Sequence, residues 1–308
     1  MKTAIAGVWH VHVDSYATTA KAHGQVLGAW DPDAALLKDF CDRTGIPAFD
    51  SWEQLLQSEA EGIIVCAATN IHTELIVSAA RAGKAIFTEK VLALTEAECD
   101  RISEAVEEAG VPFVISLFQK YLPGQRTVKR IADSGVLGRL NYVRFRNCHT
   151  GSISDWLPDR FYSAREGGGG AMIDLGAHGM YLIHWLLGLP EGYRSTFTLW
   201  DRNPRNRDRV EDNAVTVMTY ADGTVAINET GFVSKGCPIL LEVGGDRGYV
   251  IFDGTNVTLR TEKTETVEQE PELPAPIVQF LTGNILPGCG MEEAKALTRM
   301  MTGAYNNC

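Results

Sequence analysis

Residues 4–16 read AIAGVWHVHVDSY, a short apolar run, then a glycine, then the start of a helical pattern. A strand, a glycine turn and a helix in this order are typical of the first turn of a dinucleotide-binding fold, whose usual pattern is G-x-G-x-x-G. Gly7 stands at the first glycine position, but Trp9 and His12 occupy the second and third. The stretch alone leaves open whether this turn binds a pyrophosphate or only joins a strand to a helix.

The sequence after this turn predicts alternating strands and helices as far as residue 120. Strands are predicted at Thr3–Gly7, Gln25–Asp31, Gly62–Ala68, Ala85–Glu89 and Pro112–Leu117, with a weaker one at Pro47–Phe49. Helices are predicted at Val13–Ala22, Ala34–Arg43, Trp52–Ser58, His72–Ala82 and Glu96–Ala109, the last with a capping box before it and Gly110 after it. Because the strands are nearly continuous apolar runs, we expect an α/β, doubly wound Rossmann domain over residues 1–120.

The pattern changes in the second half, where strands follow one another after a helix predicted at Gln125–Ser134. These strands are expected at Leu140–His149, Ser195–Leu199, Ala214–Tyr220, Thr224–Thr230, Ile239–Val243, Gly248–Phe252 and Val257–Thr261. Asp222-Gly223 predicts a hairpin turn, and the acidic stretch 262–272 predicts a solvated edge or loop. Helices are expected at Ala171–Leu187, near Ile277–Leu281 and at Glu292–Tyr305. We therefore expect an α+β domain with an open, mostly antiparallel sheet over residues 121–308.

Composition excludes several classes of protein. No apolar run reaches the ~18 residues of a membrane span, and the N-terminal apolar run is too short for a signal peptide. A net charge of −11 argues against nucleic acid or an anionic membrane as a partner. The seven cysteines never take C-x-x-C spacing, which favours free thiols in a reducing cytoplasm and no metal site.

A carboxylate follows the second predicted strand. Asp31 lies at its carboxyl end, where such a residue commonly accepts hydrogen bonds from the adenine ribose. Asp33 follows with no arginine beside it, and two carboxylates would repel a 2′-phosphate, so NAD is favoured over NADP. The alternative is that Asp31 only caps the next helix.

Residues 69–98, TNIHTELIVSAARAGKAIFTEKVLALTEAE, carry a more specific pattern. They resemble the T-P-N-x-x-H…A-G-K-x-x-x-x-E-K-P-x-A signature of the Gfo/Idh/MocA oxidoreductases. The resemblance implies that Lys90 is the catalytic lysine and that Glu89 contacts the nicotinamide ribose. It also implies that Thr69, Asn70 and His72 form the wall near the nicotinamide. Val91 replaces the proline of E-K-P, and the proline of T-P-N is missing.

A second constellation occupies residues 167–188, GGGGAMIDLGAHGMYLIHWLLG. Asp174 and His178 stand four residues apart in a predicted helix, so both side chains would point from one face. They could be half of a metal site, a structural pair, or a general base with its orienting carboxylate. The segment Gly168 to His178 resembles the second signature of the same family, G-G-G-x-x-x-D-x-G-x-H, which favours the general base. Relatives often carry an acidic residue three positions after the histidine, where this chain has Tyr181.

The resemblance implies a dehydrogenase acting on a sugar or polyol, with NAD as cofactor. His178 would take the alcohol proton, Lys90 would hydrogen-bond the oxygen, and Asp174 would orient His178 or bind a neighbouring hydroxyl. Relatives that epimerise or cleave glycosides with bound NAD, and a non-catalytic regulator, remain alternatives. A homodimer or homotetramer through the C-terminal sheet is also implied. Substrate contacts are expected from Tyr121, Trp156, Arg160, Tyr162, Asp174 and His178.

The histidines of the opening turn complete the expected cofactor site. We predict that His10 or His12 donates a hydrogen bond to the pyrophosphate, with the bulk of Trp9 pushing that group outward or shielding it. The alternative is that both imidazoles point elsewhere.

Overall fold

The computed structural model describes all 308 residues, which divide into two compact units. Unit 1 comprises Met1–Leu117 and Pro274–Thr298, and unit 2 comprises Phe118–Leu273 and Arg299–Cys308. The division near residue 118 lies close to the boundary expected at residue 120, but residues 274–298 return to unit 1. In this segment α9 packs against α1 and β5, and the ring of Phe280 packs on Gly62, where a β-carbon would lie only 2.7 Å from the ring.

Unit 1 is built on a five-stranded sheet in the order β2-β1-β3-β4-β5, with every pair parallel. The strands are β1 Lys2–Ala6, β2 Gln25–Trp30, β3 Gly62–Val65, β4 Ala85–Thr88 and β5 Phe113–Ile115. Strand order reverses beside β1, which confirms the doubly wound topology and places the ligand side at the carboxyl ends of the strands. The stretch Pro47–Phe49 forms only one bridge, from Ala48 to Ala29, so the strand predicted there is wrong.

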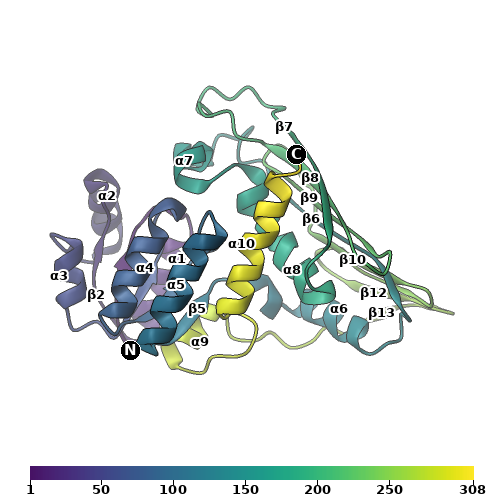
Figure 1. Cartoon of the computed structure of the whole chain (residues 1–308), viewed down its shortest axis with the longest axis horizontal. Coiled ribbons are helices and arrows are strands. Elements are labelled where there is room, and N and C mark those ends of the chain that lie inside the picture. The colour runs from purple at the N-terminus through teal and green to yellow at the C-terminus, as the bar shows by residue number, and fades with distance from the viewer. The chain divides into compact units, whose positions relative to one another are not determined.

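The helices of unit 1 follow the predicted pattern. They are α1 Val13–His23, α2 Ala34–Thr44, α3 Trp52–Gln57, α4 His72–Arg81, α5 Glu96–Ala109 and α9 Pro276–Thr282. In Figure 1, α4 and α5 pack against each other in front of the sheet, while α1 packs against α9. The capping box is present, with Thr95 and Glu98 as its two members, and α5 ends at Gly110 in the left-handed conformation.

Unit 2 is built on an eight-stranded sheet in the order β13-β12-β11-β10-β6-β9-β8-β7. Every pair is antiparallel except β6 with β9, so the predicted open, mostly antiparallel sheet is confirmed. The acidic stretch 262–272 contributes the edge strand β13. The strands are β6 Leu140–Cys148, β7 Gly192–Thr198, β8 Asn213–Thr219, β9 Val225–Gly231, β10 Leu240–Gly245, β11 Tyr249–Phe252, β12 Val257–Arg260 and β13 Thr264–Val267.

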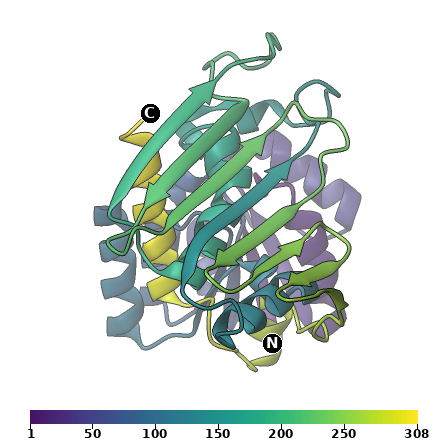
Figure 2. The same ribbon diagram turned by 90° about the vertical axis from the view of Figure 1, so that its right-hand side faces the viewer.

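Helices of unit 2 lie on one face of this sheet, and Figure 2 shows the opposite face uncovered. They are α6 Pro123–Asp133, α7 Ala164–Gly167 and α8 Ala177–Leu187, while the final helix, α10 Met291–Tyr305, begins in unit 1 and ends in unit 2. One predicted helix differs: residues 171–187 do not form a single α-helix, because Met172–Gly176 form a π-helix that leads into α8.

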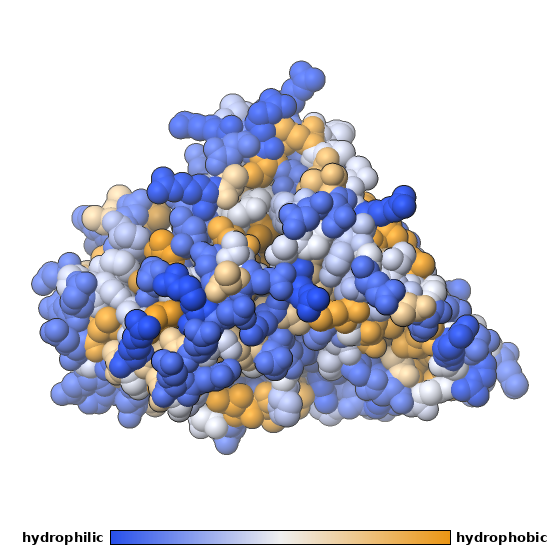
Figure 3. Space-filling view, viewed as in Figure 1, coloured by the Kyte–Doolittle hydropathy of each residue, from blue (hydrophilic) through white to orange (hydrophobic).

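Polar side chains cover most of the face drawn in Figure 3, where apolar side chains form small, scattered patches. No helix of the protein combines the length and the apolar character that crossing a membrane requires.

Candidate functional site

The turn after β1 depends on Gly7. Its φ of +83° is left-handed, and a β-carbon there would lie 2.2 Å from the α-carbon of Ala67. Five backbone N–H groups of the turn donate hydrogen bonds inside the protein. Those of Gly7, Val8, His10, His12 and Val13 donate to Trp30 O, Asp31 Oδ2, Cys66 O, His10 Nδ1 and His10 O. Much of the hydrogen-bond donor capacity of the turn is therefore used within the protein, where it stabilises the turn's conformation.

The carboxylate of Asp31 joins this turn to the end of β2. It accepts from Val8 N at 2.6 Å and from Asp33 N at 2.7 Å. Asp33, not Asp31, is the N-cap of α2, since its Oδ1 accepts from Ala35 N and Leu36 N. The alternative of Asp31 as a helix cap is thus excluded, and its contact with a ribose remains a prediction.

Glu89, which follows β4, is the centre of a buried polar cluster. Its Oε1 lies 2.8 Å from His12 Nδ1 and 3.6 Å from His10 Nδ1, and it accepts the hydroxyl of Tyr16. Tyr16 also bonds Ser116 Oγ at 2.8 Å. Burial alone would raise the pKa of the Glu89 carboxyl, but the neighbouring imidazoles and the Lys90 ammonium hold that pKa well below its usual range.

The histidines of the opening turn are therefore directed to a carboxylate. Nδ1 of each ring faces Glu89, which leaves Nε2 as the atom that could reach a phosphate. The predicted contact between an imidazole and the pyrophosphate stays a prediction, restricted to that nitrogen. Trp9 is buried, so its ring belongs to the interior of the protein.

The segment after β3 supplies the other predicted nucleotide contacts. Thr69 and Asn70 begin a short 3-10 helix, Thr69–Ile71, and the buried Asn70 Oδ1 has no hydrogen-bond partner within the protein. His72 holds the loop itself: its ring nitrogens lie 3.0 Å from Ala67 O and 3.1 Å from Leu92 O. Burial lowers the pKa of His72 against the effect of those carbonyls, so we assign this ring a structural role.

These features fit a dinucleotide. Gly7 permits the tight turn after β1, which packs on Ala67. Asp31 stands at the carboxyl end of β2, and the orphaned amide oxygen of Asn70 needs a donor. Lys90 is buried beside them, its backbone N–H donating to Glu89 Oε2 at 3.0 Å. The peptide bond between Lys90 and Val91 is cis, although the residue after it is valine and not the proline of the motif.

In unit 2, two buried polar residues hold the π-helix: Glu211, which precedes β8, and Asn228 of β9. Glu211 Oε1 accepts from Gly170 N at 3.0 Å, from Met172 N at 2.9 Å and from Tyr305 Oη at 2.7 Å. Burial raises the pKa of Glu211, while these three donors act to lower it. Asn228 on β9 donates to Gly176 O at 2.8 Å. A widened turn of this kind is common at functional sites, and here it contains Asp174 and leads directly into α8.

His178 lies in the first turn of α8 and is buried. Its Nδ1 lies 2.9 Å from the hydroxyl of Tyr181, which also accepts the backbone N–H of Gln119 at 3.2 Å. The ring of Phe118 meets the imidazole edge to face, with centroids 5.2 Å apart. Tyr181 therefore occupies, in contact with His178, the position where relatives carry an acid.

Another histidine of unit 2, His149, lies within the electrostatic influence of Asp174. Burial lowers the pKa of His149, and the Asp174 carboxylate acts in the opposite direction. The imidazole of His149 stacks on Phe232 with centroids 5.0 Å apart and meets Trp156 at 4.6 Å. Trp156 is more than half exposed, so its indole has an open face beside His149. Trp156, a predicted substrate contact, therefore meets a histidine whose pKa responds to the charge of Asp174, another predicted substrate contact.

The other predicted substrate residues are distributed over unit 2. Tyr121 is buried and Arg160 is half-buried. Tyr162 is buried, with the guanidinium of Arg205 5.9 Å from its ring centroid. These contacts do not identify a ligand, and the three assignments remain predictions.

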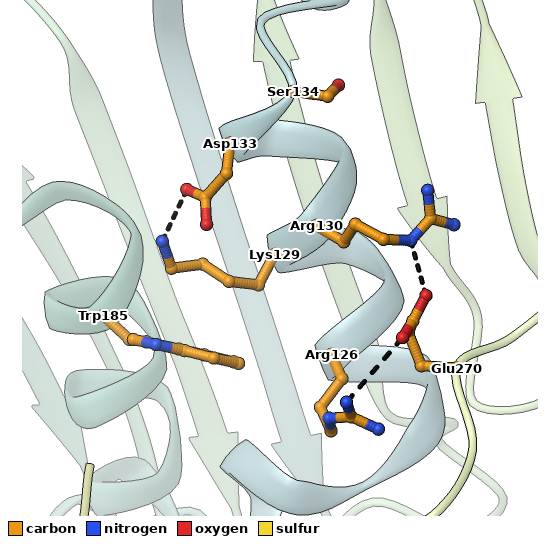
Figure 4. Close-up of a pocket in the computed structure, with 7 residues that line it drawn as sticks. All are labelled: Arg126, Lys129, Arg130, Asp133, Ser134, Trp185 and Glu270. Atoms are coloured by element: carbon orange, nitrogen blue, oxygen red, sulfur yellow. Dashed lines mark hydrogen bonds and ion pairs between the residues drawn. The ribbon is translucent and has the colours of Figure 1, made fainter. Parts of the chain in front are cut away.

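A separate cavity of about 510 Å³ opens on unit 2. Figure 4 shows α6 and α8 on its sides, with Arg126 and Arg130 both directed at Glu270 and Lys129 at Asp133. Because each of these cations faces a carboxylate and no predicted catalytic residue lines the cavity, we interpret it as a charge-paired surface groove. Its lining residues are Arg126, Lys129, Arg130, Asp133, Ser134, Trp185 and Glu270.

Sequence reasoning missed the residues that support these sites. Tyr16 and Ser116 around Glu89, and Glu211 and Asn228 around the π-helix, have no local motif that marks them. The one available signal is a polar residue at an inward-facing position of a strand, as Asn228 is on β9.

Comparison with known proteins gives two family matches and a set of relatives. The model described as "Oxidoreductase family, NAD-binding Rossmann fold" matches residues 1–117, and the "GFO/IDH/MocA C-terminal domain" matches residues 125–251. An inositol 2-dehydrogenase of Salmonella typhimurium is 26% identical over 258 residues, which are 80% of this chain and 72% of the relative.

Solved structures share the fold over the whole chain. A putative oxidoreductase from Thermotoga maritima has a TM-score of 0.85 at 17% identity, covering 100% of this chain and 97% of the other. An oxidoreductase from Agrobacterium radiobacter, in complex with NAD+, L-tartaric acid and magnesium, has a TM-score of 0.81 at 15% identity, covering 100% and 96%. At these identities the likeness shows the fold alone.

Proposed function

Since the chain belongs to the Gfo/Idh/MocA family of oxidoreductases, whose N-terminal domain is an NAD-binding Rossmann fold, we propose that it transfers a hydride between NAD and a secondary alcohol. The observation that carries this proposal is the buried imidazole of His178, held at Nδ1 by Tyr181 in the helix that follows Asp174. The similarity to inositol 2-dehydrogenases supports a cyclic polyol, a sugar or a related compound as substrate.

The cofactor would be held by the residues at the carboxyl ends of the strands of unit 1. Gly7 and Asp31 would receive the pyrophosphate and adenine ribose, while Asn70 and Glu89 would contact the nicotinamide end. The carboxylates of Asp31 and Asp33 favour NAD over NADP, because either would repel a 2′-phosphate. When bound, NAD supplies the hydride acceptor.

Side chains of the protein would accept the hydroxyl proton and stabilise the charge on the substrate oxygen. His178 would accept the hydroxyl proton at Nε2, since Tyr181 holds the other ring nitrogen. Lys90 would donate a hydrogen bond to the same oxygen and stabilise the negative charge that develops on it. Asp174 would bind a neighbouring hydroxyl or act on the imidazoles near it.

The test is a screen of polyols and sugars with NAD and, separately, NADP, following NADH formation at 340 nm. We expect turnover of at least one cyclic polyol or sugar with NAD, and its loss in Lys90→Ala and His178→Ala. A Lys90→Ala variant as active as the parent would refute the mechanism. Product formation without NADH in solution would indicate that NAD stays bound and is regenerated, as an epimerase or a glycoside-cleaving enzyme requires.

A further inference from the structure

Three metal-ligating side chains of unit 1 lie together at the turn that lacks two glycines. His10 and His12 follow β1, Glu89 follows β4, and one ligand atom from each lies within 4.8 Å of the other two. We propose that His10, His12 and Glu89 bind a divalent transition-metal ion such as Zn²⁺. This departs from the absence of a metal site that the cysteine pattern predicts.

The spacing of the three groups suits such an ion. Ligand atoms about 2.0 Å from a tetrahedral zinc lie about 3.3 Å from one another. Oε1 of Glu89 is 2.8 Å from Nδ1 of His12 and 3.6 Å from Nδ1 of His10, so these two distances bracket that separation. Two imidazoles and a carboxylate also form a ligand set that zinc uses with a fourth, open position.

The surroundings orient the ligands. The Tyr16 hydroxyl donates a hydrogen bond to Glu89 and is itself hydrogen-bonded to Ser116, so these contacts fix the orientation of the carboxylate. His10 Nδ1 accepts the backbone N–H of His12 at 3.3 Å, so this nitrogen is unprotonated, and an ion bound there would replace that long hydrogen bond. Side-chain exposure of 37% for His12, against 5% for His10 and 1% for Glu89, gives the ion a route from solvent.

Binding of the ion would compete with NAD. This step rests on the proposed function, which gives Glu89 to the nicotinamide ribose. One carboxylate cannot serve both ligands in the same geometry, so a transition metal would act as an inhibitor at the cofactor site. The ion's affinity for the nucleotide-free protein does not depend on that step.

The experiment titrates nucleotide-free full-length protein, checked by mass spectrometry, with Zn²⁺ in a calorimeter and with Co²⁺ in a visible spectrophotometer. We expect one ion per chain, with Co²⁺ d–d bands and no thiolate charge-transfer band. His12→Gln, at the exposed ligand, should weaken binding at least about tenfold, and Glu89→Gln should do the same. His23→Gln is the matched control, since His23 is an exposed histidine of the same unit that lies 2.9 Å from Thr19 O.

Several results would overturn the inference: no binding, binding that His12→Gln and Glu89→Gln both retain, or equal weakening in His23→Gln. Circular dichroism establishes that each variant is folded before its titration counts. Saturating NAD should lower the apparent Zn²⁺ affinity at least about tenfold, and an unchanged affinity would refute the shared use of Glu89. Turnover measured with a chelator present tests the proposed function alone, so either proposal can fail without the other.

Discussion

The contact between Tyr181 and His178 gives the sharpest test of the candidate site. Tyr181→Phe removes one oxygen and keeps the ring, whose centroid lies 5.6 Å from that of His178. The change deletes the 2.9 Å contact to His178 Nδ1 and the acceptor of the Gln119 N–H. Both atoms belong to buried residues, so water does not readily replace the missing hydroxyl.

The size of each effect follows from these two lost bonds. A buried N–H left without an acceptor costs about 1–3 kcal/mol, so the free energy of unfolding should fall by that amount. A positioned base contributes about 10²–10⁴-fold to a rate, and the bond to Nδ1 fixes only its orientation. We therefore expect kcat to fall roughly 10- to 100-fold, about 1.4–2.7 kcal/mol of barrier, with little change in KM.

The assays are urea denaturation followed by circular dichroism, and initial rates of NADH formation at a temperature where the variant is fully folded. Tyr220→Phe is the matched control, because it deletes a hydroxyl of the same unit that donates to Gly188 O at 3.3 Å. That control should retain its kcat. A Tyr181→Phe enzyme with kcat within twofold of the parent would show that this bond does not position the base.

Three further predictions concern the fold. A β-carbon at Gly179 would lie 2.0 Å from Asn228 Oδ1, so Gly179→Ala should lower the free energy of unfolding by about 1–3 kcal/mol in urea titrations. Gly176→Ala should lose less, because the one atom that its β-carbon would meet under 3.0 Å is Sδ of the flexible Met172 side chain; equal midpoints would contradict this. Because burial raises the pKa of Glu211 above its ordinary 4.5, the stability of the parent should fall as pH rises through the interval between the unfolded and folded pKa, and Glu211→Gln should not show that fall; parallel curves of stability against pH would exclude it. Ile227→Asp, on the uncovered face of the eight-stranded sheet, should convert the predicted homodimer or homotetramer to a monomer in light scattering, and an unchanged mass would place the interface elsewhere.

Most of the fold could be predicted because its signals are local. Apolar strands, the capping box at Thr95 and the glycine after α5 each act within a few residues, and the structure places these elements close to their predicted bounds. The return of residues 274–298 to unit 1 has no such signal. It depends on Phe280 meeting Gly62, two residues that only the folded chain brings together.

Long-range contacts of the candidate site are equally hard to predict from the sequence. Lys90, Asp174 and His178 stand in patterns that are visible in the sequence. The side chains that hold them in place belong to no such pattern. Asn228 reaches Gly176 across 52 residues, and Tyr16 reaches Glu89 across 73. The sequence predicts ordinary α-helix for Met172–Gly176, because the helical pattern continues through this segment. The contact from Asn228 that supports the π-helix is not visible in that pattern.

The missing glycines of the opening turn can now be explained in terms of conformation. The second and third glycines of the usual pattern allow backbone approach to the pyrophosphate and close packing of helix on strand. Here only Gly7 has a positive φ, while His12 has a helical φ of −78°, so the turn demands no glycine at that position. The space beside the turn is filled instead by imidazoles directed at Glu89. Five backbone donors of the turn are already used inside the protein. If the imidazoles take over ligand recognition from the main chain, as we propose, His12 variants should change nucleotide and metal affinity together.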